Sequence, residues 1–90
     1  MKVKNFISNN GNPIANQFLI TEKDKEIFQS YKSIIAVKNY KTQKTYLDEF
    51  YWDYSVTTGK YRNMFLGEGI AETRQKIKDG VYKLKNLNKK

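Results

Sequence analysis

The stretch from residue 50 to residue 67, FYWDYSVTTGKYRNMFLG, constrains this chain most, because it joins a dense aromatic cluster to the end signals of one helix. Ser55 or Thr58 can cap the free N–H groups at the start of that helix, and Gly67 suits the left-handed residue just past its end. At about 100° per residue, the helix carries a stripe of residues on one side. We expect this stripe to lie in the core: Tyr54, Thr57, Thr58, Tyr61, Met64 and Phe65.

The length of the chain, 90 residues without an internal repeat or a low-complexity linker, predicts one small basic domain over residues 1–90. A chain this short buries a smaller fraction of its surface than a longer one does. Apolar residues at structural spacing are therefore assigned to the core first. Phe, Tyr and Trp make up 14% of the residues and supply much of that core.

Cysteine and histidine are both absent from the sequence. Disulfides and thiolate metal sites are thereby excluded, as are an imidazole general base and the Ser–His and Cys–His nucleophile pairs. We therefore expect no cofactor, no metal ion and no enzymatic activity. The first apolar run ends after Ile7, too early for a signal-peptide core or a membrane span, so we expect a soluble, unexported protein that does not enter a membrane.

The remaining chain predicts a small antiparallel sheet of about five to six short strands. Its clearest turn is residues 9–13, where Asn10-Gly11 favours a tight reversal. Residues 26–38 fit either one helix or two strands, and we favour two strands because β-branched and aromatic residues dominate there. The expected strands are Lys2–Ser8, Asn16–Thr21, Glu26–Tyr31, Ser33–Lys38, Thr45–Asp48 and Val81–Leu87.

A second helix is predicted over residues 70–79, where the sequence IAETRQKIKD precedes Gly80. With the first helix near residues 55–66, this gives an α+β fold in which two helices pack at one face or end of the sheet. On the last strand, side chains alternate between the two faces. We expect Tyr82 and Leu84 to face the core and Lys83 and Lys85 to face water.

Two segments, FQSYKSIIA at residues 28–36 and YWDYSVTTGKYRNMFLG at residues 51–67, resemble a family of small uncharacterised proteins encoded by phages and prophages of Gram-positive bacteria with AT-rich genomes. The runs NQFLI and VYKLKNLN extend this resemblance to residues 16–88. The resemblance transfers no catalytic residue, and it implies a viral origin and the host bacterial cytoplasm. By analogy, phage genes of this size encode nucleic-acid-handling accessories or inhibitors of host enzymes and defence systems.

The net charge of +8 is concentrated in the last third of the chain, since residues 1–59 carry +2 and residues 60–90 carry +6. Such a field attracts phosphate polyanions and acidic protein surfaces alike. If the second helix and the last strand are neighbours, their basic side chains can share one side. The candidate nucleic-acid contacts are Trp52 and seven cations: Lys60, Arg62, Arg74, Lys76, Lys78, Lys83 and Lys85. A solvated lysine-rich surface without a partner is the alternative.

Two further patterns have structural alternatives. Trp52, Tyr54 or Tyr61 beside a lysine or arginine would suit a stacking platform for single-stranded nucleic acid. Core packing is the stronger interpretation for both tyrosines, whereas core packing and stacking are equally favoured for Trp52. The acidic group Asp48, Glu49 and Asp53 could in principle hold Mg²⁺, yet carboxylates near a turn are more often caps and solubilising charges. The run TTGK lacks the first glycine of a phosphate-binding loop, which excludes that motif.

The sequence therefore predicts an accessory or regulatory protein that binds DNA or RNA without sequence specificity, through a basic face of its C-terminal third. The alternative is an interaction protein that inhibits a host enzyme or a bacterial defence complex, with exposed aromatic residues as anchors.

Overall fold

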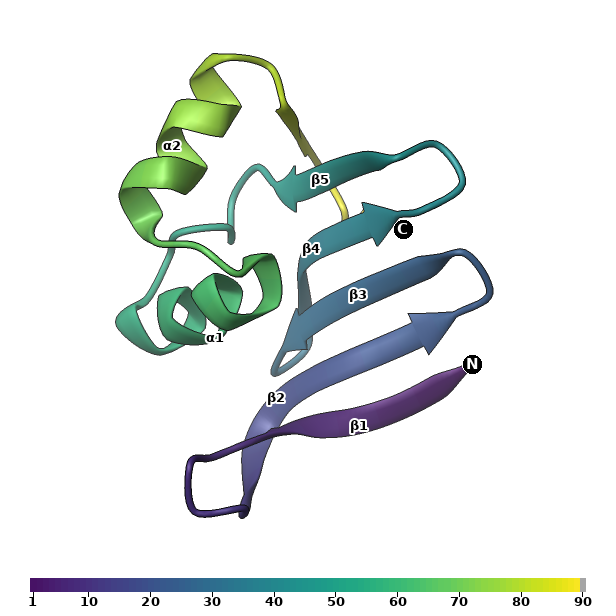
Figure 1. The fold of residues 1–90 in the computed structure, drawn as a ribbon, viewed down its shortest axis with the longest axis vertical. Coiled ribbons are helices and arrows are strands. Elements are labelled where there is room, and N and C mark those ends of the chain that lie inside the picture. Colours follow the sequence, from purple (N-terminus) through teal and green to yellow (C-terminus); the bar gives the residue numbers. More distant parts are fainter. Residues whose placement is uncertain (90) are drawn as a thin grey trace.

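The computed structural model describes residues 1–89 as a two-layer α+β fold, in which a six-stranded sheet carries two helices on one face (Figure 1). The helices are α1 (Val56–Leu66) and α2 (Ile70–Lys78). The strands lie in sequence order across the sheet: β1 (Lys2–Ile7), β2 (Pro13–Glu22), β3 (Lys25–Ser30), β4 (Ser33–Asn39), β5 (Lys44–Asp48) and β6 (Tyr82–Lys85). The predicted α+β class, with its sheet and two helices, is confirmed.

The sheet is mixed, because β6 pairs parallel to β5 whereas every other neighbouring pair is antiparallel. Short turns join β1 through β5, as antiparallel neighbours allow. Between β5 and β6 the chain instead runs through both helices, and a crossover of this length returns a strand in the parallel direction. The sheet thus differs from the antiparallel expectation at its last strand.

The ambiguous residues 26–38 form two strands, β3 and β4, as the sequence favoured. Their register shifts by one residue: Phe28 pairs with Ala36, but Gln29 pairs with Ile34. Ile35 is therefore the extra residue of a β-bulge, and its side chain is fully buried. Ile35 is one of the β-branched residues that favoured strands over a helix in this segment.

Helix α1 has both of the predicted end signals. Ser55 is the N-cap, and its side chain accepts a hydrogen bond from the Thr58 N–H at 3.0 Å. Gly67 has a φ of 72°, and its N–H donates to the Asn63 carbonyl. Because a side chain at such a φ is strained, glycine fixes the end of the helix there.

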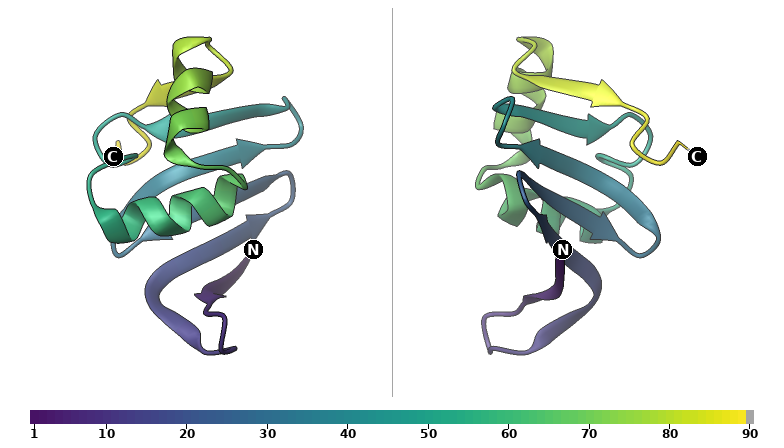
Figure 2. Two further views of the ribbon diagram at one scale, coloured as in Figure 1. Left: turned by 60° about the vertical axis from the view of Figure 1, so that its left-hand side comes forward. Right: turned by 90° about the vertical axis from the view of Figure 1, so that its right-hand side faces the viewer.

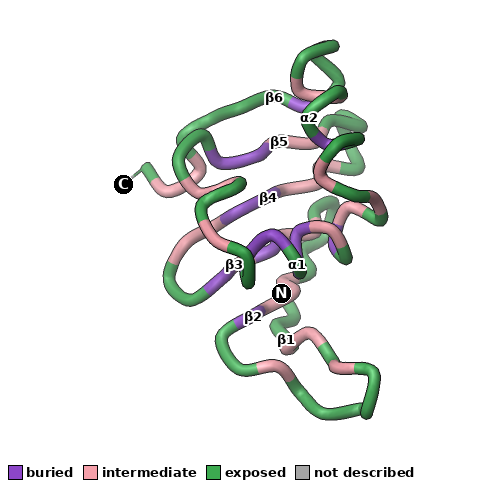
Figure 3. The backbone as a smooth tube through the Cα atoms, turned by 90° about the vertical axis from the view of Figure 1, so that its left-hand side faces the viewer, coloured by how far each residue is buried: buried purple, intermediate pink, exposed green. Residues whose placement is uncertain are grey.

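The core lies between the helices and the strands β3 to β5, where buried segments gather (Figure 3). The Phe28 ring on β3 lies 6.1 Å from the Phe65 ring on α1 and 5.3 Å from the Phe6 ring on β1, measured between centroids. The Ser30 and Thr58 hydroxyls, 3.2 Å apart, also join β3 to α1. The buried core residues are Phe28, Ile35, Ala36, Leu47, Tyr61, Phe65 and Tyr82.

The predicted core stripe of the first helix is wrong in part. Thr58, Tyr61 and Phe65 are buried, but Thr57 is exposed, and Tyr54 and Met64 are 55% and 50% exposed. The buried side of α1 is rotated toward Arg62, which pattern analysis treats as a surface residue. On β6, Leu84 is also 43% exposed rather than buried, because the helix layer contacts this strand chiefly at Tyr82.

We expect Tyr61→Ala to lower the free energy of unfolding by about 3–5 kcal/mol, because it removes a buried ring and leaves a cavity. Tyr54→Ala is the matched control. It removes the same atoms from an exposed position whose edge contact with Tyr51 is worth about 0.5–1.5 kcal/mol. Urea denaturation of both variants measures the difference. Equal stabilities would contradict the placement of Tyr61 in the core.

Candidate nucleic-acid interface

Arg62 is a buried structural residue rather than a surface contact for phosphate, since its side chain is 2% exposed. Its Nη1 donates hydrogen bonds to the Trp52 carbonyl at 2.7 Å and to the Asp53 carboxylate at 3.1 Å. Its Nη2 donates to the Asn63 side chain at 3.0 Å. A buried charge is tolerated when it is paired and hydrogen-bonded, and Asp53 meets that need. The prediction of Arg62 as a nucleic-acid contact is therefore wrong.

Two more of the side chains that were predicted to contact nucleic acid form ion pairs. Lys76 Nζ lies 2.6 Å from the Glu68 carboxylate, and Arg74 Nη2 lies 3.2 Å from the Asp53 carboxylate. Arg74 stays 65% exposed, so its pair is a weak surface contact. The two carboxylates, Asp53 and Glu68, thus reduce the positive charge of this part of the helix layer.

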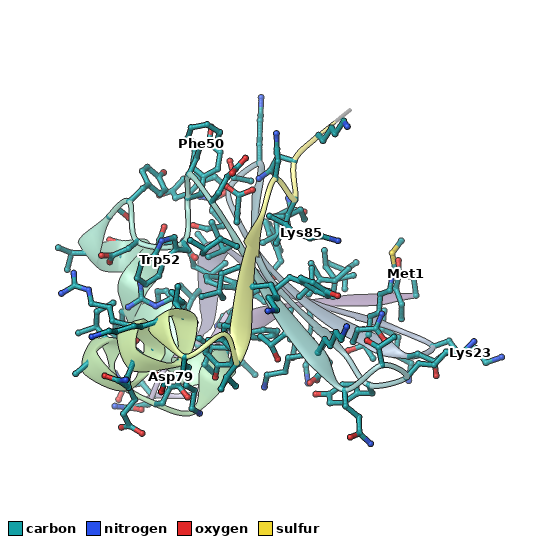
Figure 4. The ribbon with its side chains drawn as sticks, turned by 90° about the horizontal axis from the view of Figure 1, so that it is seen from above. Met1, Lys23, Phe50, Trp52, Asp79 and Lys85 are labelled. Atoms are coloured by element: carbon teal, nitrogen blue, oxygen red, sulfur yellow. The ribbon has the colours of Figure 1, made fainter. Side chains whose placement is uncertain are left out.

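The four remaining cations do not share one face. Lys60 is exposed on α1, and Lys78 is exposed in the last turn of α2. Lys83 and Lys85 lie on β6: Lys83 Nζ lies close to Gly80, just past the end of α2, whereas Lys85 is seen across the sheet from Trp52 (Figure 4). Trp52 itself is half-buried and packs against the core. The structure therefore divides the predicted basic face into a helix side and a sheet side.

No helix of residues 1–89 covers the sheet face opposite α1 and α2 (Figure 2), and the segment after β6 bonds to Asp48 and to the Ile34 backbone at one corner of it. Phe28 points toward α1, so its neighbour Ile27 points to this other face. A continuous row crosses all six strands here, each residue paired in register with the next: Val3, Ile20, Ile27, Val37, Tyr46 and Lys83. Its first five members are apolar, and they are half-buried or exposed.

Lysines border this apolar row. Strand alternation and register place four of them on the same side of the sheet: Lys25, Lys44, Lys83 and Lys85. None of the four forms an ion pair with a carboxylate of residues 1–89. The Nζ of Lys85 lies 4.7 Å from the centroid of the Tyr46 ring, a cation–π contact. We call the apolar row together with these four lysines the open face.

Of the open face, sequence reasoning named only Lys83 and Lys85, and it missed Lys25, Lys44 and Tyr46 as well as the aliphatic members of the row. The available signal was the alternation within each strand, since Lys25 and Ile27 share one side, as do Lys44 and Tyr46. Alternation does not say which side the helices cover. That information requires the strand register and the packing of α1 on β3.

The acidic group near the start of α1 is structural. Asp48 is fully buried and accepts four hydrogen bonds at 2.8 to 3.0 Å, from the N–H groups of Phe50, Tyr51 and Leu87 and from the Asn88 side-chain amide. Asp53 pairs with two arginines, and Glu49 is exposed. Within residues 1–89, no group of three potential metal-ligating side chains lies close enough to hold a metal ion.

Glu68 is the second buried carboxylate, with its side chain 3% exposed. It accepts hydrogen bonds from Lys76 Nζ at 2.6 Å, Thr73 Oγ1 at 2.7 Å and Tyr82 Oη at 2.9 Å. Burial by itself would raise the pKa of Glu68, but these three hydrogen bonds outweigh burial and hold the pKa below its usual value of 4.5. Glu68 therefore joins the loop before α2 to α2 and to β6.

This lowered pKa predicts a pH dependence of stability. A carboxyl group whose pKa is lower in the folded state stabilises the fold above its unfolded pKa, and that contribution is lost as the pH falls through the folded pKa. We expect Glu68→Gln to be less stable than the wild type at pH 7, with the difference shrinking as the pH drops below 4.5. Thermal unfolding at several pH values measures this. A difference that stays constant from pH 7 to acid would contradict the assignment.

Comparison with known proteins adds a family but no activity. The model of one family, described as a family of unknown function (DUF8033), matches residues 1–80, which include β1 to β5 and both helices but not β6. No curated protein and no solved structure matches the chain. In the part of the chain that the structure describes, neither helix has the length and hydrophobicity that crossing a bilayer requires.

Proposed function

We propose that this chain, which belongs to the family of unknown function DUF8033, binds nucleic acid without sequence specificity through the open face of its sheet. One observation carries the proposal: four lysines without ion-pair partners in residues 1–89 border two sides of a continuous apolar row on a sheet face that no helix covers. Such an arrangement can hold the phosphates of a strand on the lysines while apolar surface contacts the rest of it.

The distribution of carboxylates favours the sheet face over the helix layer. On the helix side, Asp53 is shared by Arg62 and Arg74, and Glu68 pairs with Lys76, so two carboxylates offset two of these three positive charges. On the open face, Glu22 on β2 is paired in register with Lys25, and the Asp48 carboxylate is buried and accepts four hydrogen bonds. With a net charge of +8, the chain also attracts polyanions over longer distances.

The wider role in this proposal comes from the sequence resemblance. A phage-encoded accessory or regulatory protein that handles DNA or RNA in the host bacterial cytoplasm would need affinity for nucleic acid more than base readout. The lysines of the open face act as point charges, which suits phosphate contacts made at any sequence.

We expect a labelled oligonucleotide of about 20 nucleotides to bind with a Kd in the micromolar range at low salt and to dissociate steeply as salt rises. Lys83→Glu with Lys85→Glu should weaken binding by about tenfold or more and reduce the salt slope by about two, since each substitution removes one lysine that neutralises a phosphate. Fluorescence polarisation over a salt series measures both quantities.

The matched control is Lys60→Glu with Lys78→Glu, which changes the net charge equally but on the helix side. These two substitutions should have the smaller effect. If both double variants weaken binding to the same degree, net charge rather than the open face determines affinity. Absence of binding by the wild type at low salt would refute nucleic-acid binding altogether.

A second candidate function, docking on a host protein to inhibit it, is favoured by exposed apolar residues between β5 and the first turn of α1. Phe50, Tyr54 and Val56 are 71%, 55% and 92% exposed. Tyr54 and Val56 lie beside a hollow of about 600 Å³, which is lined by residues 53–56, by one side of α1 and by Ile70. Aromatic anchors beside a hollow are typical of interaction sites.

For this second function, we expect the chain to retain one host protein from a nuclease-treated bacterial lysate, and Tyr54→Ala to lose that protein while staying folded. Nuclease treatment removes partners that are bridged by nucleic acid. Retention that is unchanged by Tyr54→Ala would exclude the start of α1 as the docking site. The Lys83→Glu, Lys85→Glu variant is the control, because its substitutions lie on the other side of the sheet.

A further inference from the structure

We propose that the open face takes single-stranded rather than duplex nucleic acid, with a base stacked on Tyr46 in the position that Lys85 occupies in the free protein. This inference rests on the proposed function and names its substrate class. It starts from the place of Tyr46 in the apolar row, where Val37 on β4 and Lys83 on β6 are its paired neighbours. The aromatic ring thus lies at the boundary between apolar surface and positive charge.

The ring of Tyr46 is accessible from the open side of the sheet. A flexible lysine side chain reaches it there, since Lys85 Nζ lies 4.7 Å from the ring centroid. Lys85 is exposed, and its chain can move without disturbing the core. A cation–π contact at an exposed site is weaker than the stacking of a base on an aromatic ring. Exchange of Lys85 for a base is therefore favourable, and the released ammonium group becomes free to contact a phosphate.

The charges on the open face lie at the margins of the five apolar residues of the row. Lys25 and Lys44 are the first residues of β3 and β5, and Lys83 and Lys85 lie on β6. A single strand can follow the lysines with its phosphates and turn its bases onto the apolar centre. The nearby Phe18, paired in register with Asn5 and Gln29, adds a second aromatic ring to the same face.

A duplex fits this surface less well. Its bases are already stacked and paired, so it would present phosphates to Ile20, Ile27 and Val37 and would leave their apolar surface unmatched. Reading a duplex through its major groove requires an inserted helix or a two-stranded ribbon. No element of residues 1–89 projects from the open face, since both helices lie on the other side of the sheet (Figure 2).

A second copy of the chain is a poorer occupant as well. Face-to-face packing would bury the apolar row, but it would also bring two sets of unpaired lysines together. Like charges brought into contact at an interface are unfavourable. An acidic protein surface would satisfy the lysines, but it would make no specific use of the Tyr46 ring.

The experiment compares three labelled probes of equal length at one salt concentration: a single strand with bases, an abasic single strand and a duplex. The single strand with bases should bind about tenfold more tightly than the abasic strand, as stacking of one base predicts. Tyr46→Leu keeps apolar bulk without the aromatic ring, and it should abolish this difference. Tyr46→Phe keeps the ring and should retain it. Tyr31→Ala, an exposed tyrosine in the turn after β3, is the control.

The outcomes separate this inference from the proposed function. Equal binding of the single strand and the abasic strand, or tighter binding of the duplex, would overturn the stacking of bases on Tyr46 while leaving nucleic-acid binding in place. Displacement of the single strand by polyglutamate at equal charge concentration would show that charge alone acts, and would overturn the inference too. If none of the three probes binds, the proposed function fails and this inference fails with it.

Discussion

The buried carboxylate of Asp48 is the interaction on which the proposed site most depends. It ends β5, and its four hydrogen bonds hold the turn that leads toward α1 and the segment that follows β6. Asn88, one of its donors, also bonds to both backbone groups of Ile34 on β4. A strand as short as β6 contributes few ladder hydrogen bonds of its own. Asp48 and Asn88 therefore fix the strand that carries Lys83 and Lys85.

The other buried ionic groups have a consequence for electrostatics. Arg62 and Glu68 are each held inside by partners of opposite charge, Asp53 and Lys76. Pairs of this kind satisfy buried charges that would otherwise be costly, and they also remove cations from the field of the helix layer. Lys60 and Lys78 on the helices and the lysines of the open face are among the cations that stay without an ion pair in residues 1–89. The packing of the helices thus decides which cations stay unpaired.

Much of the fold could be predicted from the sequence, because local rules govern it. The cap at Ser55, the left-handed residue at Gly67 and the β-branched content of residues 26–38 act over a few neighbouring residues, and each had the predicted effect. The core stripe of α1 was predicted less well. Pattern analysis assigns charged residues to water, and it does not include the partners from residues 52–63 that make a buried Arg62 favourable.

The sequence by itself determined the composition of the surface: many lysines, no histidine or cysteine, and enough aromatic residues for a small core. Only the tertiary structure decided which lysines are free and which face they share. The row from Val3 to Lys83 joins residues that are far apart in the chain, and strand register alone brings them together. A candidate site of this kind has no local motif, because it arises where the helices leave one side of a sheet uncovered.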